Sequence, residues 1–188
     1  MYQVKSNAKT EIVIKNSKFI GLVYHVQTED DIKEIINELK ETYKDYTHLT
    51  YAWKLINKQK SFDDGEPGGT AGMPFLEVIN KNELVNTLIV VIRYFGGIKL
   101  GAGGLIRAYS KAAREALKES DIEIFVEYNF YELTASYDDL RLLNTLTEKY
   151  DIIKKDFNEE IKYKIKVAKD FDNAKDIFKY TEIKIKKL

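Results

Sequence analysis

The sequence contains no cysteine among its 188 residues. Disulfide bonds, thiolate-ligated metal sites and a cysteine nucleophile are therefore excluded. Histidine is also scarce, since His25 and His48 are the only two. The chain carries neither a histidine-rich metal pattern nor a serine nucleophile elbow, so covalent catalysis and zinc chemistry are disfavoured.

Long apolar runs are missing as well. The longest, residues 88–92, is far too short to cross a bilayer. Residues 1–5 lack the apolar core of a signal peptide. These absences predict a cytoplasmic protein that makes no membrane contact.

Neither sign of charge is in excess, because 30 basic residues balance 30 acidic ones. Electrostatic recognition must therefore come from local clustering. Arginine is rare here, yet Arg93, Arg107 and Arg114 all fall between residues 93 and 114. The planar guanidinium holds phosphate or carboxylate with two hydrogen bonds. This grouping points to an anion site, with chance in a small sample as the alternative.

The hydrophobic pattern predicts an α+β fold with two domains, residues 1–122 and 123–188. In the first domain, Thr28 should cap a helix that carries Asp30 and Asp31 in its first turn and fades near Tyr43. Residues 57–72 are predicted to form a loop. The pattern further predicts strands at residues 10–15, 19–26, 49–56 and 84–95, and helices at 71–81 and 104–119.

In the second domain the predicted order is β-α-β-β-α-β, the ferredoxin-like arrangement. The strands are expected at residues 128–135, 152–157, 161–167 and 182–187, and the helices at 137–150 and 171–180. Strict alternation in 161–167 should place one face outward, with Lys162, Lys164, Lys166, Lys184 and Lys186 on it. Only Tyr128 and Phe130 offer aromatic rings there, so sequence-specific RNA recognition is not expected.

Glycine is concentrated in one stretch, because nine of the ten glycines and both prolines lie between residues 65 and 104. Such density marks backbone with unusual dihedral angles or a close approach to another group. Two blocks stand out. Residues 63–74 read Asp-Asp-Gly-Glu-Pro-Gly-Gly-Thr-Ala-Gly-Met-Pro, and residues 93–109 read Arg-Tyr-Phe-Gly-Gly-Ile-Lys-Leu-Gly-Ala-Gly-Gly-Leu-Ile-Arg-Ala-Tyr.

These blocks resemble the signature segments of the IMPACT/YigZ family, and residues 48–53 resemble its third short motif. The resemblance covers the whole chain. It implies an N-terminal domain of the βαβ type found in a ribosomal protein and in elongation factor G, and a second domain similar to another elongation-factor domain. It also implies a link to translation and to the stress response, because eukaryotic relatives regulate translation by interfering with activation of a kinase that responds to amino-acid starvation.

Standard phosphate loops are absent. A Rossmann fingerprint from Gly101 would need glycine where Ile106 stands, and a Walker loop from Gly96 would need Lys after Gly101. A strand, a glycine loop and a helix start at Gly103-Gly104 remain, an arrangement that can bind an anion. Lys99 and Arg107 would flank it. Tight packing of the helix on a sheet is the alternative role for these glycines.

Two charged clusters accompany the glycines. Arg107, Lys111, Arg114 and Lys118 recur on one helix face and could contact RNA phosphates, or could simply be solvated. Asp63, Asp64 and Glu66 could hold Mg²⁺ or serve as acid and base. We interpret the acidic group instead as ordering its loop or contacting a partner. No cofactor, metal or catalytic residue is therefore predicted.

The sequence favours a non-catalytic regulator of translation that binds RNA, the ribosome or a ribosome-associated protein. One alternative is a phosphate- or nucleotide-binding protein or Mg²⁺-dependent enzyme using the same glycine loop, and another is a protein-interaction module. The predicted binding residues are His48, Asp63, Asp64, Glu66, Thr70, Arg93, Tyr94, Gly96, Gly97, Lys99, Gly101, Gly103, Gly104, Arg107, Lys111 and Arg114.

Overall fold

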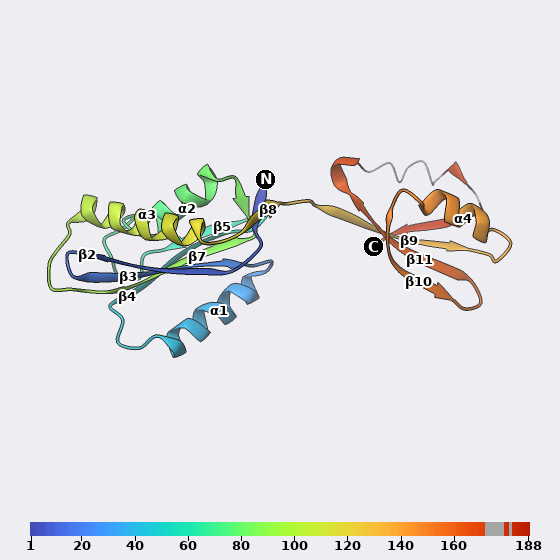
Figure 1. Cartoon of the computed structure of the whole chain (residues 1–188). Helices are drawn as coiled ribbons and strands as arrows, with labels where there is room; N and C mark the ends of the chain where they lie inside the picture. Colours follow the sequence, from blue (N-terminus) through green and yellow to red (C-terminus); the bar gives the residue numbers. More distant parts are fainter. Residues whose placement is uncertain (172–178, 181) are drawn as a thin grey trace. The chain divides into compact units, whose positions relative to one another are not determined.

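A computed structural model describes residues 1–171, 179–180 and 182–188 of this mixed α and β protein (Figure 1). The chain divides into two compact units, Met1–Phe125 and Val126–Leu188. This division lies three residues beyond the expected boundary, because β8 (Ile122–Ile124) forms a ladder with β1 (Tyr2–Val4) at the start of unit 1. No helix within the described residues is long and apolar enough to span a membrane.

Unit 1 is built on a five-stranded antiparallel sheet with the order β2-β3-β7-β4-β5. Its strands are β2 (Ala8–Ile14), β3 (Ser17–His25), β4 (His48–Lys54), β5 (Gln59–Phe62) and β7 (Thr87–Tyr94). The central strand β7 is buried along almost its entire length, as its continuous apolar run predicts.

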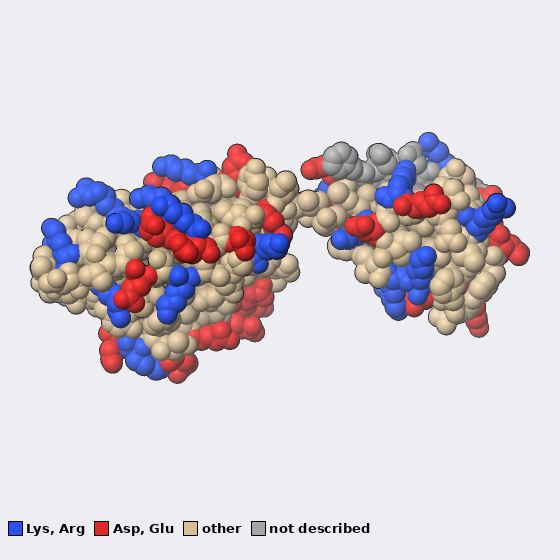
Figure 2. All heavy atoms as spheres, in the orientation of Figure 1, with Lys and Arg blue, Asp and Glu red and all other residues tan. Residues whose placement is uncertain are grey.

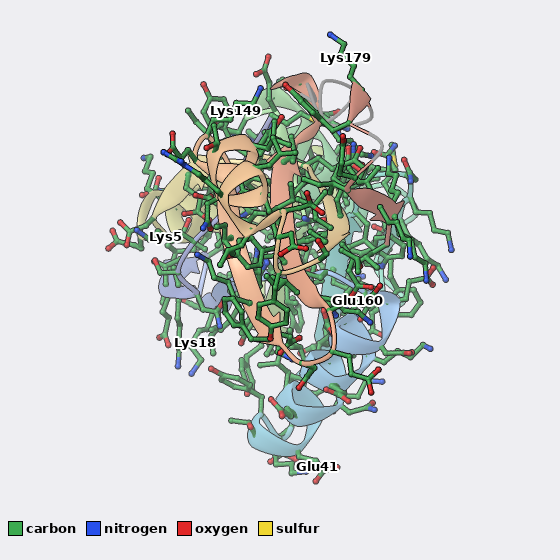
Figure 3. All side chains as sticks on the ribbon, turned by 90° about the vertical axis from the view of Figure 1, so that its right-hand side faces the viewer. Lys5, Lys18, Glu41, Lys149, Glu160 and Lys179 are labelled. Carbon is green, nitrogen blue, oxygen red and sulfur yellow. The ribbon has the colours of Figure 1, made fainter. Side chains whose placement is uncertain are left out.

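Helices cover both faces of this sheet (Figure 1). Both α2 (Gly72–Lys81) and α3 (Ala102–Lys118) pack on one face, and α1 (Glu29–Thr42) packs on the other. The predicted cap of α1 is confirmed, because Thr28 and Asp31 form a reciprocal capping box. Charged side chains such as Glu41 near the end of α1 point away from the sheet (Figure 3).

Two predictions for unit 1 are wrong. The single strand expected at residues 84–95 is two, β6 (Leu84–Val85) and β7, because Asn86 takes a left-handed conformation with φ 51°. The bend lets β6 pair with β1 in a small second sheet. The loop expected at residues 57–72 begins with β5, an edge strand whose polar side chains hid it from a hydrophobicity pattern.

Unit 2 is an antiparallel sheet with the strand order β10-β11-β9-β12. Its strands are β9 (Tyr128–Ala135), β10 (Asp151–Phe157), β11 (Ile161–Ala168) and β12 (Lys184–Lys187). The alternation predicted for β11 is confirmed, because Ile161, Tyr163, Ile165 and Val167 are buried. Lys162 and Lys184 both pair with Thr134, and Lys164 and Lys186 both pair with Glu132, so these lysines share one face.

The first helix of unit 2 differs from the prediction. The helix α4 (Leu140–Thr147) is three residues shorter at each end than the expected 137–150. At its start, a turn in which the Ser136 hydroxyl donates to the Asp139 carboxylate precedes the helix. A short 3-10 turn, η1 (Lys169–Phe171), follows β11. Most of the helix predicted at 171–180 lies outside the described residues.

Candidate functional site

Two glycine-rich segments meet on the α2/α3 face of unit 1. We call residues 63–74 the first glycine segment and residues 93–109 the second. The first joins β5 to α2, and the second runs from the end of β7 through a loop into α3. His48 at the start of β4 pairs with Arg93 across the sheet. The three family-like motifs are therefore neighbours in space.

The first glycine segment satisfies its own polar groups. The Asp63 carboxylate accepts hydrogen bonds from the backbone N–H groups of Gly69 at 2.8 Å, Ala71 at 3.0 Å and Gly72 at 2.8 Å. Because α2 has no side-chain cap at its adjoining Ala71, Asp63 supplies that function from a distance along the chain. Asp63 therefore orders the loop, which is one of the two roles that the sequence interpretation left open for this acidic group, the other being contact with a partner.

Asp64 and Thr70 also have hydrogen-bond partners, Asp64 in β4 and Thr70 within the segment. The Asp64 carboxylate accepts from the Leu49 N–H at 2.7 Å, and the Thr70 hydroxyl donates to the Pro67 carbonyl at 2.7 Å. Thr70 is buried. Within the described ranges, no three His, Asp or Glu side chains are placed to hold a metal ion.

Glu66 is different, because its buried carboxylate links the two segments. One oxygen, Oε1, accepts from the Arg93 guanidinium and, at 2.7 Å, from the Tyr109 hydroxyl. The His48 Nε2 atom lies 3.6 Å from that oxygen. His48 Nδ1 lies 2.7 Å from the Asp64 carbonyl, which can only accept, so Nδ1 carries a hydrogen and Nε2 faces the carboxylate.

The position of Arg93 follows from strand geometry. Successive side chains of β7 point to opposite faces, so Arg93 faces α2 and α3 while Tyr94 packs among the apolar residues on the α1 face. The Cζ atom of the Arg93 guanidinium lies 5.4 Å from the ring centroid of Phe19 and 5.3 Å from that of Phe95. A buried charge is tolerated there because Glu66 neutralises it.

Tyr109 lies in the part of this cluster that is fully excluded from solvent. Burial raises the pKa of its hydroxyl well above the ordinary value of 10.0, and the hydrogen bond to Glu66 raises it further. The phenol is therefore a fixed hydrogen-bond donor to the carboxylate at any ordinary pH. Its ring packs edge-on against Phe19 and Phe75, which ties the cluster to the core of unit 1.

A cavity of about 370 Å³ opens beside this cluster. We call it the motif cavity, and its walls are Thr47, His48, Glu66, Pro67, Arg93, Phe95, Lys99, Leu100, Gly101, Ala102 and Leu105. Five predicted binding residues meet there, namely His48, Glu66, Arg93, Lys99 and Gly101. The apolar walls were not predicted, although Pro67, Phe95 and Leu100 lie inside the quoted motifs.

The other predicted residues lie outside the walls of the motif cavity. Gly96 packs against backbone, because a Cβ there would lie 2.0 Å from the Asn16 carbonyl carbon, and Gly97 has a φ of +82°. Gly103 and Gly104 belong to the first turn of α3. Asp63, Asp64, Thr70 and Tyr94 lie in the internal positions given above, and Arg107, Lys111 and Arg114 lie along α3.

The cations of α3 form an exposed row. We call Arg107, Lys111, Arg114 and Lys118 the α3 stripe, and all four are exposed. Lys118 pairs with Glu115 at 2.8 Å, and this ammonium lowers the pKa of that carboxyl. The other three have no acidic partner within 4.0 Å in the part of the chain that the structure describes. Figure 2 shows blue side chains along α3, with acidic ones among them.

Known proteins are similar to this chain in sequence and in fold. Residues 15–117 match the family described as the Impact N-terminal domain. The Bacillus subtilis IMPACT family member YvyE is 39% identical over 178 residues, covering 92% of this chain and 82% of its own. The Escherichia coli IMPACT family member YigZ is 32% identical over 151 residues, covering 77% and 74%.

A solved structure described as that of a hypothetical protein superposes over nearly the entire chain. Its TM-score is 0.71 at 25% sequence identity, and the match covers 98% of this chain and 95% of the other. The sequence matches span both the glycine segments and, for YvyE, most of unit 2. The chain belongs to the IMPACT family.

Proposed function

We propose that this protein is a non-catalytic, cytoplasmic regulator linked to translation, and that it binds RNA of the translation apparatus through the α3 stripe. The carrying observation is that Arg107, Lys111 and Arg114 lie exposed on one helix face with no acidic oxygen within 4.0 Å among the described residues, although the charges of Lys111 and Arg114 add to that of Lys118 in lowering the pKa of Glu115. Unpaired cations at helical spacing can contact successive phosphates. The family resemblance adds the link to translation.

The proposed folds of the two units agree with this function. The strand order β10-β11-β9-β12 is the order of a ferredoxin-like sheet, and the open face of that sheet carries Lys162, Lys164, Lys184 and Lys186. Lys164 and Lys184 lie within 4.0 Å of Glu132 and Glu160, respectively. This second face is therefore partly neutralised and ranks below the α3 stripe as an RNA contact.

The α3 stripe predicts a definite salt dependence. Each phosphate neutralised by a cation contributes about −0.9 to the slope of log affinity against log salt for duplex nucleic acid, and about −0.7 for single strands. Because the net charge of the whole chain is zero, local contacts alone set this slope. Loss of two stripe cations should make the slope shallower by roughly 1.4 to 1.8.

The test is binding of the full chain to fluorescent RNA and to ribosomes across a salt series. We expect Arg107→Ala/Lys111→Ala to weaken binding strongly and to flatten the slope. A matched control is Lys33→Ala/Lys44→Ala on α1, where both lysines pair with neighbouring acids. Equal loss in both double variants, or no RNA binding by the folded parent, would contradict the proposal.

A Mg²⁺-dependent enzyme has less support. The Asp63 and Asp64 carboxylates both accept backbone N–H groups, and Glu66 is held by Arg93 and Tyr109. A metal would have to displace these donors. A protein-interaction module predicts instead a complex that persists after nuclease treatment and in high salt, and the salt series distinguishes it directly.

A further inference from the structure

We propose that the motif cavity is a binding site for a phosphate monoester that carries a planar ring, as in a nucleoside monophosphate. The cavity holds about 370 Å³, within the usual range for small-molecule sites. A bare phosphate would leave much of it unfilled. Its walls combine cationic and polar groups at one side with apolar side chains, and that combination fits an anion attached to an apolar body.

The start of α3 provides the first part of the anion site. Gly101 and Ala102, at the N-terminus of this 17-residue helix, form part of the cavity wall. No side chain caps the helix, so its first N–H groups and the positive end of its dipole remain for a ligand. Lys99 lies in the same wall and has no acidic partner within 4.0 Å among the residues described.

Arg93 provides the second and independent part. Its side chain is only 5% exposed, and it lies in the cavity wall. A guanidinium has five N–H donors. One nitrogen donates to Glu66, another reaches the Ser17 hydroxyl only at 3.5 Å, and Nε has no partner. A buried donor without a partner is costly, and an anion in the adjoining cavity could satisfy Arg93 Nε.

The balance of charge in the wall favours an anion. Glu66 is the only acidic residue among the eleven, whereas Lys99 and Arg93 are both cationic. Glu66 already accepts hydrogen bonds from Arg93 and from the Tyr109 hydroxyl, so its negative charge is neutralised within the protein. Lys99 and the helix N-terminus then leave the cavity with a net positive field.

Phe95 gives the site its preference for a ring. Its side chain lines the cavity, and the residue is 45% exposed although it is large and apolar. The Arg93 guanidinium lies 5.3 Å from the ring centroid, which holds the phenyl group in position. Leu100, Leu105 and Pro67 complete the apolar wall. A planar heterocycle can stack on such a ring, as bases do on aromatic side chains.

This ligand site goes beyond the proposed function and does not rest on it. Lys99 and Phe95 precede α3, whereas the α3 stripe begins at Arg107. The same chemistry could come from a free nucleotide or from the 5′-phosphate at an RNA end. A free nucleotide reaches the cavity without the stripe, whereas an RNA end would bring the stripe into contact as well.

The experiment is calorimetric titration of the full chain with AMP, adenosine, inorganic phosphate, and a short RNA with either a 5′-phosphate or a 5′-hydroxyl. We expect a phosphate-bearing nucleotide, free or at the RNA end, to bind at least tenfold more tightly than adenosine or phosphate alone, since each half of the site contributes. Tighter binding of AMP identifies a free nucleotide as the ligand, and selective binding of the 5′-phosphorylated RNA identifies an RNA end.

Variants make the assignment specific. Lys99→Gln should weaken binding of the preferred probe roughly tenfold, since a charge-assisted hydrogen bond is lost, and Phe95→Leu should weaken AMP more than phosphate. Lys33→Gln on α1, where the lysine is exposed and pairs with Asp30, is the matched control and should leave AMP binding unchanged. Emission from the single tryptophan, Trp53 in β4, verifies the fold of each variant.

Two results would overturn the site. The first is the absence of measurable binding of AMP and equal binding of both RNAs. The second is AMP binding that Lys99→Gln and Phe95→Leu leave unchanged. Neither result affects the α3 stripe, because RNA binding that is sensitive to Arg107→Ala/Lys111→Ala can persist without an occupied cavity.

Discussion

The two glycine segments are similarly rich in glycine, with 4 of 12 and 5 of 17 residues, but they differ in how many of their hydrogen-bonding groups have partners. In the first, Asp63 accepts three backbone N–H groups and Thr70 returns its hydroxyl to the same loop. In the second, the N-terminus of α3 has no side-chain cap and Lys99 has no ion-pair partner within the described ranges. Glycine density alone therefore does not identify a ligand site. The proposed ligand site rests instead on donors without partners beside a cavity.

Glu66 in the first segment hydrogen-bonds to Arg93 and Tyr109 in the second. Its replacement should therefore have the largest effect on stability. Glu66→Gln removes the charge that neutralises buried Arg93. We expect about 3 kcal/mol or more of lost stability in unit 1, because an uncompensated buried charge remains. Urea unfolding followed by Trp53 emission measures it. The exposed Glu77→Gln should shift stability by less than about 0.5 kcal/mol, and similar losses in both variants would disprove the link.

Neighbouring glycines separate packing from backbone conformation within the second segment. Gly96→Ala would place a Cβ 2.0 Å from the backbone of Asn16, and we expect about 3 kcal/mol of destabilisation from overpacking. Gly97→Ala meets no atom within 4 Å but has a φ of +82°, so about 1 kcal/mol is expected. The same urea titration compares them. Equal costs would show that the contact at Gly96 relaxes.

Neighbouring aspartates test saturation of the first segment. Both oxygens of Asp63 accept backbone N–H groups. Because Asp63→Asn replaces one of these acceptors with an NH2 donor, we expect about 2 kcal/mol of lost stability. Asp64 accepts through one oxygen, which an asparagine can keep, so Asp64→Asn should cost less than about 1 kcal/mol. A larger loss for Asp64→Asn in thermal melts would reverse their assigned roles.

The smallest effect concerns Tyr109 at high pH. The folded protein keeps this phenol protonated above pH 10, because burial raises its pKa, whereas the unfolded chain ionises near pH 10. The unfolded state then binds fewer protons, so the stability from Tyr109 falls as pH rises above about 10. Tyr109→Phe should cost about 1.5 kcal/mol at pH 7, and this difference should shrink above pH 10. Urea midpoints from pH 7 to 11 measure it.

Much of the fold could be predicted because its signals are local. Each signal lies within one short window of sequence: the apolar positions of α3, the capping box at Thr28 and the alternation of β11. The break at Asn86 gives no such signal, because asparagine can be left-handed without any change in hydrophobicity. The edge strand β5 was not predicted for a similar reason, because its mostly polar residues give no hydrophobic pattern.

The site was predictable by residue type but not by arrangement. The sequence showed that Glu66, Arg93 and Lys99 belong to unusual segments. It could not show that Glu66 spans from one segment to Arg93 and Tyr109 in the other, since no periodicity relates those positions. The apolar wall at Phe95 and Leu100 depends on how the loop between β7 and α3 folds, which only tertiary structure reveals.

The small sheet of β1, β6 and β8 affects when unit 1 can finish folding during synthesis. Tyr2 pairs with Ile124, at the opposite end of the unit's sequence. At about 5–20 residues per second on a ribosome, β1 is made roughly 6 to 24 s before β8 can join it. The amino-terminal strand must therefore wait with one edge unpaired, and nascent chains arrested before residue 122 should remain more sensitive to protease at their amino terminus than chains released after residue 125.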